Sequence, residues 1–115
     1  MGIIDSIEIG HGHVRFNTIV AMSKQSIFPG FHALSEPIRI QIIELLQSNR
    51  ELCVSDIAQS LGLNQSKLSF HLKTLNQSGL VIARRQGRRM YYSLNTAQFS
   101  MLEDYLSQVR QLEGN

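Results

Sequence analysis

The stretch that decides the fold is VSDIAQSLGLNQSKLSFHLKTLNQSG, residues 54–79. It contains two segments with the apolar spacing of amphipathic helices, separated by Gly62. Gly62 and Gly79 stand where such helices end, because glycine readily adopts the left-handed conformation of a helix C-terminus. Asn64 is placed to cap the second helix. The residues predicted to face the core are Val54, Ile57, Ala58 and Leu61 in the first helix, and Leu68, Leu72 and Leu75 in the second.

The flanking segments predict two more helices and a hairpin. Upstream, PIRIQIIELL predicts a helix entered through Ser35 and Pro37. Its apolar stripe is Ile38, Ile42, Leu45 and Leu46. Downstream, VIARRQGRRMYYS has strand-forming residues on both sides of a turn around Gln86 and Gly87. Four arginines lie near the tip of this hairpin: Arg84, Arg85, Arg88 and Arg89.

The last segment, residues 96–114, predicts a closing helix with an apolar stripe. The stripe is formed by Phe99, Leu102, Leu106 and Val109. On so small a domain the stripe of a terminal helix often meets a second subunit, so we expect a homodimer held by these residues.

This order of elements predicts a winged helix-turn-helix, a mainly α fold with a small β-hairpin as the wing. The chain of 115 residues fits one small domain. We assign that domain to residues 23–115. Residues 1–22 have weak periodicity and three glycines, so we interpret them as an N-terminal extension.

The charge distribution points to a polyanionic partner. The net charge is only +2, but there is no acidic residue from Ile57 to Leu102, where six lysines and arginines lie. A solvated basic face is the simpler explanation. A segment of one sign inside a balanced chain, however, is typical of proteins that bind nucleic acid.

In a winged helix-turn-helix the second helix enters the major groove of DNA. Gln65, Ser66 and Ser69 are then placed to hydrogen-bond base edges. The residues expected to neutralise phosphates are Lys67, Lys73 and the four hairpin arginines. Phe70 is unusual on a solvent-facing side: it either touches a thymine methyl group or leans on the wing. His71 has either a structural or a phosphate-contacting role, rather than that of a metal ligand.

Three separate motifs resemble the ArsR/SmtB family of bacterial winged-helix repressors over roughly residues 30–112. They are FHALSEPIRIQIIELL, with Arg39 after the proline, LNQSKLSFHLKTLNQSGLV, and GRRMYYSL. The resemblance implies a homodimer formed by the first and last helices, which binds a palindromic operator and is released by an inducer. The arsenic-responsive subgroup is the most similar, and its sensor begins with a Cys-Val-Cys-Asp run at this point.

The corresponding run here is CVSD, residues 53–56, in which Ser55 stands at the second cysteine position. Trivalent arsenic and antimony require two or three thiolates, because soft metalloids prefer soft ligands. Cys53 is the only cysteine, so the arsenic site is incomplete. Cys53 is then either a small buried hydrophobic residue or a redox-sensitive thiolate, which makes a thiol-redox-responsive repressor an alternative.

Other metal sites are not predicted, and we expect no cofactor. The family's second metal site, on the last helix, needs histidine, whereas this helix offers only Glu103, Asp104 and Glu113. His11 and His13 lie in a glycine-rich stretch that is more often simply flexible.

Two other function classes compete with a DNA-binding repressor. A winged-helix protein-interaction module has the same fold, but does not need a continuous basic helix and wing. An enzyme is not expected, because the sequence shows no nucleophile-base pair and no phosphate-binding glycine loop. We also expect a cytoplasmic protein, since the start of the chain lacks the pattern of a secretory signal and the chain has no membrane-spanning apolar run.

Overall fold

The computed structural model describes residues 27–111. The predicted extension at residues 1–22, with His11 and His13, lies outside the described residues, as does Glu113. Residues 27–33 are helical. The elements that follow are α2 (Pro37–Ser48), β1 (Leu52–Cys53), α3 (Val54–Leu61), α4 (Gln65–Gln77), β2 (Val81–Gln86), β3 (Arg89–Leu94) and α5 (Thr96–Arg110).

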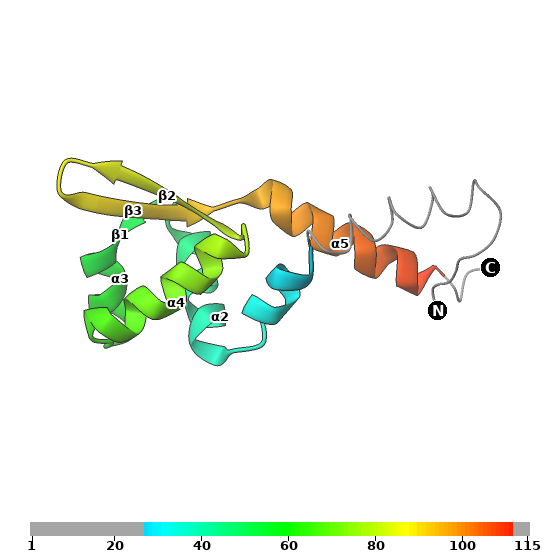
Figure 1. Ribbon diagram of the computed structural model, residues 1–115, viewed down its shortest axis with the longest axis horizontal. Helices are drawn as coiled ribbons and strands as arrows, with labels where there is room; N and C mark the ends of the chain where they lie inside the picture. The colour runs from blue at the N-terminus through cyan, green and yellow to red at the C-terminus, as the bar shows by residue number, and fades with distance from the viewer. Residues whose placement is uncertain (1–26, 112–115) are drawn as a thin grey trace.

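The architecture is the predicted winged helix-turn-helix. Helices α2, α3 and α4 lie together on one side of a small sheet, the β2–β3 hairpin extends from one end of the molecule, and α5 extends from the other (Figure 1). The sheet is antiparallel with strand order β1-β3-β2. Gln86 pairs with Arg89, so the turn itself consists of Gly87 and Arg88, one residue later than predicted.

The predicted helix ends are confirmed in the helix-turn-helix. The Asn64 side chain accepts a hydrogen bond of 2.8 Å from the Lys67 backbone N–H and caps α4. Gly62 ends α3 with a φ of 65°, and Gly79 follows α4 with a φ of 82°. Both are left-handed conformations that other residues adopt at a cost.

The start of α2 differs from the prediction by one residue. Glu36, not Ser35, is the N-cap, and its carboxylate accepts from the backbone N–H groups of Ile38 (2.7 Å) and Arg39 (3.3 Å). Ser35 instead donates its hydroxyl to the carbonyl of His32. Pro37 stands at the first helical position, as predicted.

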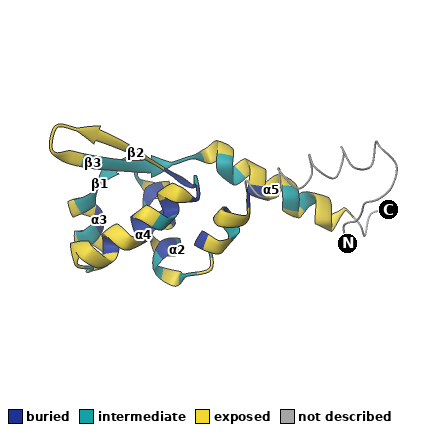
Figure 2. Cartoon of the chain, viewed as in Figure 1, coloured by how far each residue is buried: buried dark blue, intermediate teal, exposed yellow. Residues whose placement is uncertain are grey.

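The core lies where α2, α3 and α4 meet beneath the sheet (Figure 2). Its largest fully buried side chains are Ile42, Ile57, Leu68, Leu72, Leu75, Leu80 and Val81. The predicted stripes of α3 and α4 pack here. In α2, Ile38 and Leu45 are only half-buried, whereas Ile43, which the predicted stripe left out, is buried.

Strand β1 was not predicted, because two residues offer no periodicity to detect. Leu52 pairs with Tyr92 and Cys53 with Tyr91 on β3. This pairing joins the wing to the segment between α2 and α3, so the hairpin is braced on one side by the helix-turn-helix itself.

Helix α5 packs against residues 27–33. A Cβ atom on Gly30 would lie 3.0 Å from a methyl carbon of Leu102, so glycine permits this close approach. One turn further along α5, Tyr105 meets Phe31 edge-on, with ring centroids 5.9 Å apart. The apolar stripe of α5 is therefore covered by the protomer's own chain over its first half.

Candidate nucleic-acid interface

The outer side of α4 is exposed and polar, as predicted. Its N-terminal turns present Gln65, Ser66, Lys67, Ser69, Phe70 and Lys73 to solvent. The opposite side is anchored in the core by Leu68, Leu72 and Leu75. Because the buried stripe fixes the rotation of α4 about its axis, the sequence determines which residues face outward.

His71 lies on the buried side of α4 and is 6% exposed. Its Nδ1 is 3.1 Å from Nη1 of Arg39. Since a guanidinium group only donates hydrogen bonds, this nitrogen is the acceptor and carries no proton. Of the two roles considered for His71, burial favours the structural one, so we withdraw it from the predicted DNA contacts.

The surroundings of His71 favour its neutral form. Desolvation by burial is the main cause that lowers its pKa below the ordinary 6.5, and the charges of Arg39 and Lys67 act in the same direction. Glu36 opposes them, but its Oε1 is 3.9 Å away. Because Nδ1 carries no proton, the two atoms are both acceptors, and the His71–Glu36 approach is neither an ion pair nor a hydrogen bond.

Arg39, which donates to His71, is itself buried, with 6% of its surface exposed. Its Nε donates to the carbonyl of Ala33 at 2.8 Å. One guanidinium group therefore links the end of the helix at residues 27–33 to α4. Sequence reasoning assigned no role to Arg39, although its place between Ile42 and Ile43 around the helix was a signal that it faces inward.

Three of the four wing arginines extend into solvent. Arg85, Arg88 and Arg89 are exposed, and within residues 27–111 none of them forms an ion pair. Arg88 and Arg89 lie at and beside the turn of the hairpin. Their contact with phosphates stays a prediction, and their exposure is compatible with it.

Arg84 is different, because a carboxylate already holds it. Its Nε and Nη2 donate to the two carboxylate oxygens of Glu51 at 2.9 and 2.7 Å. Nη1 donates to Gln86 at 2.8 Å, and the guanidinium carbon lies 4.9 Å from the ring centroid of Tyr91. The Arg84–Glu51 hydrogen bonds lower the pKa of Glu51 and raise that of Arg84. Sequence reasoning missed Glu51, which lies outside the segment without acids.

A groove of about 320 Å³ joins α4 to the wing. Gln65 and Ser69 line it from α4, and Arg88 and Arg89 line it from the hairpin. The structure thus brings predicted base-reading and phosphate-binding residues to one surface, although about twenty residues separate them in the chain.

Cys53 lies at the inner end of the same groove and is 3% exposed. Its Sγ is 3.3 Å from the Ser55 hydroxyl and donates to Oδ2 of Asp56 at 3.2 Å. This arrangement uses the protonated thiol. Between the two roles considered for Cys53, its burial and its donor role favour the small buried residue over the reactive thiolate.

The outer half of α5 continues the apolar stripe beyond the protomer's body. Leu106 and Val109 are 55% and 50% exposed. Leu102, by contrast, is 3% exposed and belongs to the protomer's own core, so it is not available to a partner. Phe99 is half-buried. Of the four residues predicted for the dimer surface, the two at the end of the helix are therefore the exposed ones.

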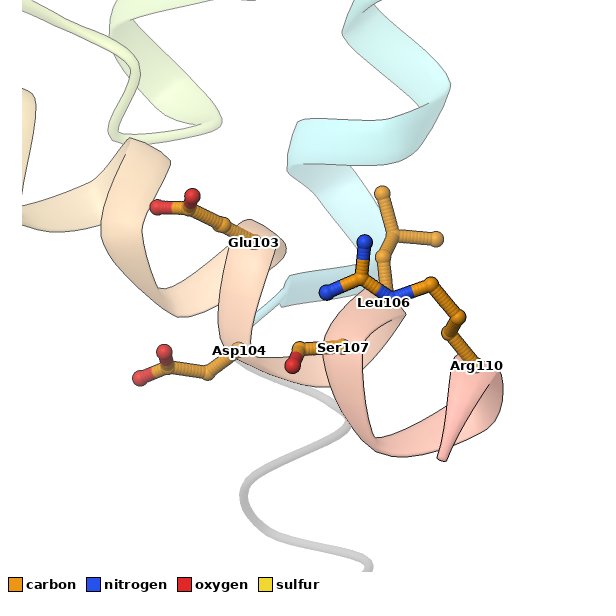
Figure 3. A pocket seen from close by; sticks show the side chains of 5 residues that line it. All are labelled: Glu103, Asp104, Leu106, Ser107 and Arg110. Atoms are coloured by element: carbon orange, nitrogen blue, oxygen red, sulfur yellow. The ribbon is translucent and has the colours of Figure 1, made fainter. Parts of the chain in front are cut away.

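A shallow pocket on α5 is lined by Glu103, Asp104, Leu106, Ser107 and Arg110 (Figure 3). In the described part of the chain, no group of three or more histidine, cysteine or acidic residues is arranged to hold a metal ion. Nor does any helix between residues 27 and 111 have the length and apolarity needed to cross a membrane.

Comparison with known proteins gives a consistent family. The model described as "Bacterial regulatory protein, arsR family" matches residues 36–83, from the cap of α2 to the middle of β2. The arsenical resistance operon repressor of Escherichia coli (strain K12) is 40% identical over 65 residues, which cover 56% of this chain and 56% of that protein. The chain thus spans little more than half the length of this relative.

Two further relatives are matched over more of their length. The transcriptional repressor SdpR of Bacillus subtilis (strain 168) is 34% identical over 67% of this chain and 81% of that protein. Among solved structures, the homodimeric winged helix-turn-helix DNA-binding domain of a Mycobacterium bovis protein superposes with a TM-score of 0.64. It is 29% identical, and the match covers 79% of this chain and 84% of that one.

Proposed function

The chain belongs to the arsR family of bacterial regulatory proteins, and from that premise we propose that it is a transcriptional repressor that binds double-stranded DNA as a homodimer. The observation that supports this most directly is the shared surface of α4 and the wing. Exposed polar residues of α4 and exposed arginines of the hairpin line one groove. These residues all come from the segment Ile57 to Leu102, which has no acidic residue.

In this mode α4 lies in the major groove. Gln65, Ser66 and Ser69 donate to or accept from base edges, which gives sequence specificity. Lys67, Lys73, Arg85, Arg88 and Arg89 contact phosphates. These contacts supply affinity but no sequence information.

Two copies are required for a palindromic site. The end of α5 leaves Leu106 and Val109 exposed, which suits packing against the same helix of a second copy. The pair then presents two α4 helices to half-sites about one helical turn apart. A regulator of this kind acts where the chromosome is, so we place it in the cytoplasm.

The test is a fluorescence-anisotropy titration of duplexes from the region upstream of the chain's own gene. We expect one duplex to bind much more tightly than a scrambled duplex of equal length, with affinity that falls steeply as salt rises. Equal, weak binding to both duplexes would favour the alternative of a protein-interaction module.

A further inference from the structure

Phe70 stands in the middle of the surface of α4 that faces away from the core. It is 62% exposed, between Ser66 and Lys73, which lie four positions before and three after it and therefore on the same side of the helix. The groove toward the wing is lined by Gln65 and Ser69, on the neighbouring side. Phe70 thus points into solvent and does not line the groove toward the hairpin.

The Phe70 ring contacts the ring of one buried residue, His71. It meets the ring of His71 edge-on, with centroids 5.2 Å apart and an interplanar angle of 75°. His71 accepts from Arg39 at 3.1 Å, and Arg39 also donates to the Ala33 carbonyl at 2.8 Å. A series of contacts therefore connects the core to the exposed ring. These contacts restrict the ring before it binds, so less conformational entropy is lost on binding.

The major groove offers one apolar group for such a ring. Among the base edges exposed there, only thymine has a methyl group, at C5, while the other groups are hydrogen-bond donors and acceptors. We propose that Phe70 recognises a thymine in each half-site by packing on its 5-methyl group, and that Arg39 and His71 are positioning residues for the ring. This inference rests on the proposed function.

The test uses a duplex selected from a random-sequence pool for tight binding to the full-length protein. Each thymine is then replaced, one symmetric pair at a time, by deoxyuridine, which lacks only the methyl group. We expect one pair of positions at which the wild-type affinity falls about fourfold per half-site, the factor that corresponds to the burial of one methyl group. Other thymines should give little change.

The Phe70→Ala variant should bind the thymine duplex less tightly and should not distinguish thymine from deoxyuridine at that pair. Phe70→Leu keeps an apolar side chain and should retain part of the discrimination. Because Phe70 touches no phosphate in this arrangement, the salt dependence of Phe70→Ala should equal that of the wild type. Lys73→Ala is the matched control, with a reduced salt slope and intact discrimination.

The positioning role has its own readout. In Arg39→Lys a single Nζ replaces the two separate donor atoms, Nε and Nη1, that reach Ala33 and His71 in the wild type. The ratio of thymine to deoxyuridine affinity should therefore fall while the salt slope stays the same. An unchanged ratio in a folded Arg39→Lys protein would remove Arg39 from this role.

Two results would overturn the main inference while leaving the proposed function intact. One is tight, salt-dependent binding with no thymine pair sensitive to deoxyuridine. The other is sensitivity that persists in Phe70→Ala. Failure of the wild type to prefer any duplex from the pool would instead count against the proposed function.

Discussion

His71 shows how one residue on a DNA-facing helix can serve the core. From the sequence alone, a histidine among the leucines of α4 could be either exposed or buried. Its position around the helix is just beside the apolar stripe, at the boundary between the two faces. What decides is the partner: Arg39 comes from α2, far away in the chain, and donates to its Nδ1. Pairings of this kind depend on how two helices pack, which the pattern of either helix alone does not determine.

The buried histidine makes stability depend on pH. Its pKa lies below the ordinary 6.5 in the folded protein, so below that pH the unfolded chain binds more protons than the folded one. Stability is therefore fully present above about pH 6.5 and is lost as the pH falls through the folded pKa. We expect urea unfolding to show a lower free energy at pH 5.5 than at pH 7.5.

The control is His71→Asn, whose amide oxygen lies near the position of Nδ1 and so still accepts from Arg39 but does not titrate. Its loss of stability between the two pH values should be smaller than that of the wild type. Equal losses in both proteins would show that other groups cause the pH dependence.

Ser55 is the basis of a prediction about arsenite. Its hydroxyl lies 3.3 Å from Sγ of Cys53, so a cysteine at this position places two sulfurs side by side at the start of α3. We expect arsenite to leave the wild type on DNA, because one thiolate lacks the chelate that makes metalloid binding tight. Ser55→Cys should bind arsenite more tightly and be released from DNA by it.

A titration of DNA-bound protein with arsenite under reducing conditions, followed by anisotropy, measures both effects. Cys53→Ala is the control. Release of the wild type at low micromolar arsenite, absent in Cys53→Ala, would contradict the view that this sensor is incomplete.

In the wing, a carboxylate already neutralises the charge of one arginine. Four arginines near the hairpin tip are equivalent in the sequence, yet Arg84 is held by Glu51 on both carboxylate oxygens. Strand β1 is the reason, because it pairs with β3 and so brings Glu51 within reach of β2. A strand of two residues leaves no periodic signal, so this contact could not be predicted, whereas the helices and the hairpin could.

We expect Glu51→Gln to free Arg84 for DNA. In the wild type the Glu51 carboxylate accepts from two N–H groups of the Arg84 guanidinium, Nε and Nη2, that could otherwise bind a phosphate. The slope of log affinity against log salt should become steeper by about 0.9 for each protomer if Arg84 gains one phosphate contact. Anisotropy on a duplex of unrelated sequence measures this without interference from base contacts.

Two arginine variants separate the roles within the wing. Arg88→Ala with Arg89→Ala should flatten the salt slope of the wild type, whereas Arg84→Ala should leave it nearly unchanged. A slope that Arg84→Ala reduces as much as the double variant would mean that Arg84 already contacts DNA and that Glu51 does not withhold it.

The molecule is elongated, with the wing at one end and the exposed end of α5 at the other (Figure 1). The sequence predicted the α5 stripe correctly, but periodicity does not reveal which part of a stripe a chain covers itself. Here residues 27–33 cover it at Leu102, through the close approach that Gly30 permits. The second half, at Leu106 and Val109, is exposed in the protomer, and we propose that a partner covers it.

We therefore expect Leu106→Glu combined with Val109→Glu to give a folded monomer. Both side chains are at least half exposed, so charges there cost the protomer little, but two copies of each would be buried together in a dimer without partners of opposite sign. Sedimentation velocity at micromolar concentration should show a dimer for the wild type and a monomer for the double variant. Ser100→Glu, which adds a charge to the opposite side of α5, should remain a dimer.

DNA binding supplies an independent measure of the same change. A dimer contacts phosphates in both half-sites, so its salt slope should be about twice that of the monomer on the same palindromic duplex. The monomeric variant should also bind a single half-site as tightly as the full palindrome, because it gains nothing from the second half. If the double variant sediments as a dimer, the partner surface lies elsewhere on the molecule, and the exposed residues at the end of α5 need another explanation.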